Sequence, residues 1–68
     1  MNYGRVYRII TPRAVYGVVV RDGVVVDSGP VGFFLRGRRW FHVEGWARQE
    51  GFNVADLGEK KPPETRGV

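Results

Sequence analysis

The stretch VVVRDGVVV, residues 18–26, decides the fold of this chain. Two valine runs flank Asp22-Gly23, and an Asp-Gly loop between apolar β-branched runs is the strongest short-range signal for a β-hairpin. Both loop positions need a positive φ, which glycine adopts freely and aspartate tolerates better than most residues. The sequence therefore predicts two antiparallel strands, over residues 14–21 and 24–27.

The same turn fixes which side chains share a face of the hairpin. The predicted pairs are Arg21 with Val24, Val20 with Val25, and Val19 with Val26. One face then carries Val15, Gly17, Val19, Val24 and Val26, and the other carries Tyr16, Val18, Val20 and Val25. Both faces are apolar, whereas helices of the same chain are expected to cover only one of them. We therefore expect this protein to form a homo-oligomer.

Working outward, residues 3–10 (YGRVYRII) have the aromatic and β-branched content of a further strand. Pro12 separates this strand from the hairpin, because proline cannot donate a hydrogen bond to a sheet. After the hairpin, Pro30 follows a glycine and predicts the start of a short helix over residues 30–36.

Residues 39–50 fit a longer amphipathic helix. At about 100° per residue, Trp40, Val43, Trp46 and Ala47 fall within one arc of roughly 120°. Gly51 is suited to end this helix, and residues 52–57 (FNVADL) then predict a short fourth strand.

These elements predict an α+β fold with a three-stranded antiparallel meander, a short helix, a longer amphipathic helix and a short fourth strand. The alternative is a small all-β barrel, in which residues 33–36 and 39–43 form a second hairpin. The domain is expected to span residues 1–57. Residues 58–68 are rich in proline, glycine and charge, and are expected to form a disordered C-terminal tail.

A pattern of small and aromatic residues follows the hairpin and its DGVVV turn: Gly37, Trp40, Val43, Trp46, Ala47 and Gly51, and then Val54. Over residues 14–57 the order of these features resembles that of short uncharacterised proteins encoded by phages, archaeal viruses and their hosts. The resemblance implies a hairpin followed by helices and a strand. It implies no activity, ligand or catalytic residue.

Composition narrows the class of protein. The chain has 68 residues, no cysteine and a formal net charge of +4. So short a chain buries a small core, and without disulfides or thiolate metal sites, self-association is the remaining way to stabilise it. The sequence has no apolar run long enough for a membrane span and no secretory signal, so we expect a cytoplasmic protein, in a host cytoplasm if it is viral. The basic charge favours an anionic partner.

Catalytic and metal chemistry have little support in the sequence. Ser28 is the only serine and lies near a predicted helix start, and His42, the only histidine, falls on the polar side of its helix. Neither a Walker A nor a Rossmann glycine spacing occurs. We therefore expect no enzyme, no catalytic residue, no metal site and no cofactor.

The segment 36–42 (RGRRWFH) combines arginines with aromatic residues. Guanidinium groups bind phosphates, and aromatic rings stack on bases. This combination predicts a nucleic-acid-binding site formed by Arg36, Arg38, Arg39 and Arg48. Phe41 falls on the polar side of the helix and is expected to contact a partner. The alternative function is a protein-interaction module, such as a viral or accessory factor that binds a host protein.

Overall fold

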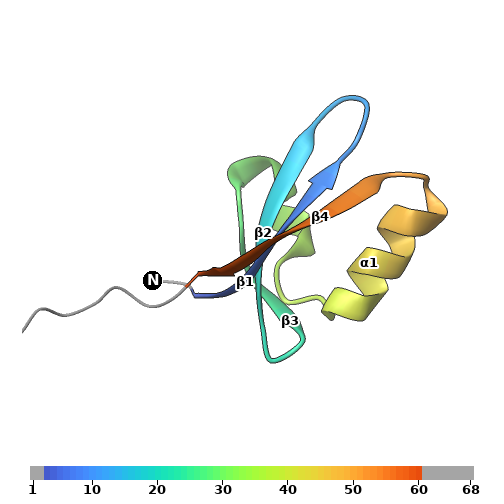
Figure 1. Cartoon of the computed structure of the whole chain (residues 1–68). Helices are drawn as coiled ribbons and strands as arrows, with labels where there is room; N and C mark the ends of the chain where they lie inside the picture. Colours follow the sequence, from blue (N-terminus) through green and yellow to red (C-terminus); the bar gives the residue numbers. More distant parts are fainter. Residues whose placement is uncertain (1–2, 61–68) are drawn as a thin grey trace, which may run out of the picture.

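The hairpin around Asp22-Gly23 is present in the computed structural model, which describes residues 3–60 (Figure 1). Its turn residues have φ angles of 55° and 75°, the positive values that the sequence predicts. The elements in chain order are β1 (Gly4–Ile10), β2 (Val15–Arg21), β3 (Val24–Ser28), the 3₁₀ helix η1 (Pro30–Leu35), α1 (Trp40–Gln49) and β4 (Asn53–Lys60).

The register of the hairpin agrees with the prediction for the two pairs beside the turn and differs at the third. Val19 lies opposite Asp27, not Val26, because Val26 is the extra residue of a β-bulge in β3. The predicted Val19–Val26 pair is therefore wrong. A bulge places two residues opposite one and increases the local twist. As a consequence, Ser28 pairs with Val18 and is buried.

All four strands are antiparallel and form one sheet in the order β3-β2-β1-β4. The two outer strands do not pair with each other, so the sheet is not closed. The chain leaves β3, passes through η1 and α1, and returns to the opposite edge as β4 (Figure 1). This arrangement confirms the α+β prediction. The all-β barrel is wrong, because residues 40–43 begin α1 and do not form a strand.

The core lies between one face of the sheet and the two helices. Its buried members are Ile9, Val18, Val20, Val25, Leu35, Trp40, Val43 and Ala47. Three of them come from α1 at the predicted helical spacing, and the Trp40 ring stacks on Tyr7 of β1 with centroids 4.3 Å apart. Trp46, the fourth residue of the predicted apolar arc, is 37% exposed. The apolar face of α1 is thus confirmed except at this residue.

The predicted short helix over 30–36 is a 3₁₀ helix with a kink at Gly32. The fourth strand is longer than predicted and continues through residues 58–60, which pair with the first half of β1. Their glycine and charges favour a tail, yet the edge of β1 offers backbone hydrogen-bond partners that the local composition does not reveal. The tail prediction is therefore wrong for residues 58–60. Residues 61–68 lie outside the part of the chain that the structure describes.

The face of the hairpin that points away from the core is only partly exposed. Val15 is 53% exposed and Val19 is 8% exposed, while Val24 and Val26 have intermediate exposure. The apolar surface that prompted the homo-oligomer prediction is thus smaller than the sequence indicates. Self-association stays a prediction.

Candidate functional site

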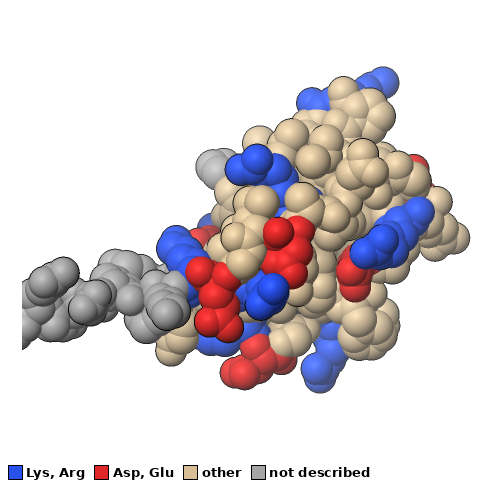
Figure 2. Space-filling model, viewed as in Figure 1, with Lys and Arg blue, Asp and Glu red and all other residues tan. Residues whose placement is uncertain are grey.

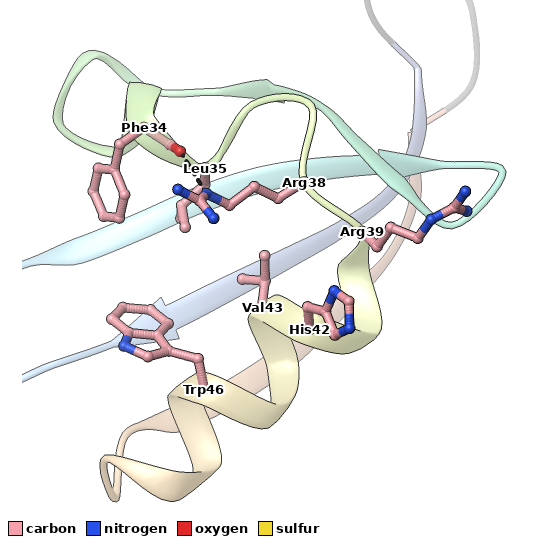
Figure 3. Close-up of a pocket in the computed structure, with 7 residues that line it drawn as sticks. All are labelled: Phe34, Leu35, Arg38, Arg39, His42, Val43 and Trp46. Carbon is pink, nitrogen blue, oxygen red and sulfur yellow. Dashed lines mark hydrogen bonds between the residues drawn. The ribbon is translucent and has the colours of Figure 1, made fainter.

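A groove lies between α1 and the segment that precedes it, and we call it the η1–α1 groove (Figure 3). Its volume is about 480 Å³, within the range of roughly 300–1,000 Å³ that is typical of small-ligand sites. It is lined by Phe34, Leu35, Arg38, Arg39, His42, Val43 and Trp46. Leu35 and Val43 are buried core residues and form an apolar floor. The other five are exposed and form the walls and the rim.

The backbone that carries the basic rim is bonded to the outer edge of β3. The Gly37 N–H donates to the Val25 carbonyl at 2.8 Å, and the Val25 N–H donates to the Arg38 carbonyl at 2.9 Å. The Trp40 N–H donates to the Gly23 carbonyl at 2.8 Å. The segment 37–40 thereby lies beside β3 almost as a fifth strand, which fixes the position of both rim arginines relative to the sheet.

The cationic part of the rim consists of two arginines. Arg38 Nε donates a hydrogen bond of 3.0 Å to the Phe34 carbonyl, so its guanidinium reaches along the groove wall (Figure 3). Arg39 is the residue before α1, and its side chain extends away from Phe34 and Trp46 in the same view. Neither guanidinium forms an ion pair with an acidic group in residues 3–60. Both charges therefore remain available to an anion.

The opposite end of the groove is aromatic. Phe34 is 43% exposed and Trp46 is 37% exposed, and their ring centroids lie 6.5 Å apart with the planes at 89°. Each ring also makes an edge contact with a second ring: Tyr16 lies 5.8 Å from Phe34 and Phe52 lies 5.5 Å from Trp46, centroid to centroid. No ring in the described chain stacks parallel on the Trp46 indole. The groove thus joins a cationic rim to an accessible aromatic end.

The other two predicted phosphate-binding arginines lie outside the groove lining and are paired with acids. Arg36 Nη2 lies 3.4 Å from the Asp27 carboxylate and 3.3 Å from the Ser28 carbonyl. Arg48 lies one helical turn after Glu44 and is 3.0 Å from its carboxylate. The structure therefore brings together only Arg38 and Arg39 of the four.

Phe41 is 64% exposed on α1, in agreement with the expectation that its ring faces outward. Its ring lies beside the His42 imidazole, with centroids 4.1 Å apart and the planes tilted by 45°. It does not line the groove. A contact of Phe41 with a partner stays a prediction.

Charges elsewhere on the molecule are mixed in sign. Figure 2 shows basic side chains at the tip of the β1–β2 turn, and interspersed acidic and basic ones near the far end of the sheet. Arg5 and Asp56 make a close pair there, 2.9 Å apart. The hydrogen bond from Arg5, together with one from the Gly58 N–H, lowers the pKa of Asp56, and the same pairing with Asp56 raises the pKa of Arg5. The face in this view carries no continuous basic patch.

Phe34, His42 and Trp46 are groove residues that the sequence does not assign to a site. On a helical wheel Trp46 lies at the edge of the predicted apolar arc, about 40° from His42. An aromatic residue at the boundary between the apolar and polar faces is the signal that points to a half-exposed ring. Phe34 has no comparable signal, because a kinked 3₁₀ helix has no fixed wheel.

No group of three or more histidine or acidic side chains within residues 3–60 is placed to hold a metal ion. None of the helices in this range is long and apolar enough to cross a membrane. Comparisons with protein-family models, curated proteins and solved structures find no match for this chain.

Proposed function

We propose that this protein is a non-catalytic module that binds nucleic acid through the η1–α1 groove, with Arg38 and Arg39 contacting phosphates. One observation carries the proposal: among residues 3–60 these two arginines on the groove rim have no acidic partner, whereas Arg36 and Arg48 are paired with carboxylates. The carboxylate beside Arg36 or Arg48 offsets the charge of that arginine and repels a phosphate, whereas an arginine with no acidic neighbour presents its full charge to an anion.

The geometry of Arg38 favours phosphate binding further. A guanidinium has five N–H donors, and the bond from Nε to the Phe34 carbonyl uses one of them. The two Nη groups remain free to donate to a phosphate, and the existing bond restricts the side chain to a conformation along the groove. A restricted side chain loses less entropy when its ligand binds.

Within residues 3–60, neither Ser28 nor His42 has a partner group placed for nucleophilic catalysis. The Ser28 hydroxyl is buried and has no hydrogen-bond partner among the described residues, so no base is in place to activate it. His42 is exposed and lies beside Phe41. We therefore assign neither a catalytic role. A cytoplasmic location remains part of the proposal.

The test compares two variants with the same change in net charge. One replaces the unpaired arginines (Arg38→Gln, Arg39→Gln) and the other replaces the paired ones (Arg36→Gln, Arg48→Gln). Anisotropy of a labelled DNA oligonucleotide gives the affinity over a series of salt concentrations. Each lost phosphate contact is expected to lower the slope of log K against log salt by about 0.9 for duplex DNA or about 0.7 for a single strand.

For the variant without Arg38 and Arg39, we expect this slope to fall by about two such increments. For the variant without Arg36 and Arg48, we expect the slope to change little. Equal losses from both variants would mean that net charge, not the groove, governs binding. Absence of binding by the unmodified protein to DNA or RNA at low salt would refute the proposed function.

The second candidate function is a protein-interaction module, and exposed aromatic residues favour it. Phe33 on η1 and Phe41 on α1 are 68% and 64% exposed. Exposed aromatic rings of this kind are enriched at protein interfaces, with a host protein or a second copy of this chain as the partner. The salt series separates the two candidates, because apolar contacts survive high salt whereas phosphate contacts weaken.

A further inference from the structure

We infer that the η1–α1 groove accepts an unpaired base, so that the nucleic acid it binds is single-stranded. This inference rests on the proposed function and specifies its ligand. The base stacks against the exposed part of the Trp46 indole, and the phosphate beside it binds Arg38.

The first argument is the position of the cation relative to the ring. The bond from Arg38 Nε to the Phe34 carbonyl holds the guanidinium close to the residue whose ring shares the aromatic end with Trp46. A phosphate donor and a stacking surface therefore lie within one groove of about 480 Å³. Binding sites for single strands combine these two features, with cations along the backbone and aromatic rings for the bases.

The second argument is the apolar surface that the groove wall exposes. Phe34 and Trp46 are 43% and 37% exposed, whereas Leu35 and Val43 beneath them are already buried. A paired base within a duplex is stacked on both sides and leaves such a surface unused. An unstacked base presents its face to the aromatic wall and covers apolar surface, which gains free energy in addition to that of the phosphate contact.

The third argument is that the aromatic end is built before any ligand arrives. Tyr16 and Phe52 support the two rings through edge contacts, and both supporting residues pack against the core. The stacking surface needs no reordering of the chain. Tyr3 is 40% exposed, close to the 37% of Trp46, and lies outside the groove, so it serves as the control for a general effect of an exposed ring.

The experiment measures binding of a short oligodeoxythymidylate, a duplex of the same length, and inorganic polyphosphate, which carries charge without bases. The chain has two tryptophans, and Trp40→Phe leaves Trp46 as the only one. Quenching of its fluorescence then reports stacking. Because Trp40 belongs to the core and its replacement risks the fold, anisotropy with Trp46→Leu and Trp46→Phe provides an independent measurement in the otherwise unmodified chain.

We expect the single strand to bind more tightly than the duplex and polyphosphate, and to quench Trp46. Trp46→Leu is expected to weaken single-strand binding about tenfold, within the range of about 5- to 150-fold for loss of one base–aromatic stack. Trp46→Phe retains a ring and is expected to lose less affinity for the single strand. Tyr3→Leu, outside the groove, is expected to bind as the unmodified protein does.

Three results would overturn the inference: equal binding of duplex and single strand, binding without quenching, or equal losses from Trp46→Leu and Tyr3→Leu. Each of these leaves the proposed function standing as nucleic-acid binding without base stacking on Trp46, provided that DNA binds more tightly than polyphosphate. Polyphosphate binding as tight as that of both DNAs, or no binding of any oligonucleotide, removes the proposed function together with the inference.

Discussion

Replacing Ser28 with alanine is expected to stabilise this protein, which is the opposite of the usual result at a buried position. Ser28 is the last residue of β3, is 7% exposed, and has a hydroxyl with no hydrogen-bond partner within residues 3–60. An unsatisfied buried polar group costs about 1–3 kcal/mol, and Ser28→Ala removes it. Removal of the oxygen atom also loses a few van der Waals contacts of about 0.1–0.2 kcal/mol each, which reduces the gain in stability by about 0.5 kcal/mol.

The net gain for Ser28→Ala is therefore about 1 kcal/mol, and urea and thermal denaturation followed by circular dichroism measure it. In a domain of this size the gain corresponds to a rise in Tm of about 4–8 °C. Ser28→Cys keeps a side chain of similar size with a weakly polar thiol, so it is expected to gain as well. A loss of stability in Ser28→Ala would refute the reasoning, because it would mean that the hydroxyl makes a hydrogen bond in solution.

Two further predictions concern the far end of the sheet. Gly4 has a φ of 148°, and a Cβ there would lie 2.2 Å from the Val20 carbonyl oxygen, so Gly4→Ala is expected to cost about 1–3 kcal/mol. An unchanged urea midpoint would contradict this. Arg5 and the Gly58 N–H lower the pKa of Asp56 in the folded protein below its unfolded value near 3.8. The pairing therefore stabilises the fold above that pH, and the stabilisation is lost as the pH falls through the folded pKa. Acidification below about pH 4 should therefore cost the wild type more stability than Asp56→Asn, and equal acid sensitivity in urea titrations would contradict the assignment.

The elements that the sequence predicts best are those whose signal is local. The Asp22-Gly23 turn and the spacing of Trp40, Val43 and Ala47 each depend on a few neighbouring residues, and both are confirmed. The bulge at Val26 has no such signal, because a run of three valines fits either register. The length of β4 likewise cannot be predicted from local sequence, because its end is determined by pairing with β1, about fifty residues earlier in the chain.

The same distinction applies to the candidate site. The sequence identifies a cluster of arginines around residue 38, but the fold decides which of them are available. Arg36 pairs with Asp27 of β3, nine residues earlier in the chain. Glu44 and Arg48 are four residues apart, the spacing at which helix side chains meet, so their ion pair can be predicted from the sequence alone. The aromatic end of the groove depends on tertiary contacts and is found only in the structure.

The main-chain bonds between residues 37–40 and the edge of β3 bear on how fast a ligand associates. A loop that must first fold around its ligand slows association and loses backbone entropy on binding. Here the backbone under Arg38 and Arg39 already shares the hydrogen-bonded ladder of the sheet, so a ligand of the proposed site is expected to order side chains alone. We therefore expect electrostatic steering and diffusion to set its association rate, without a rearrangement of this backbone.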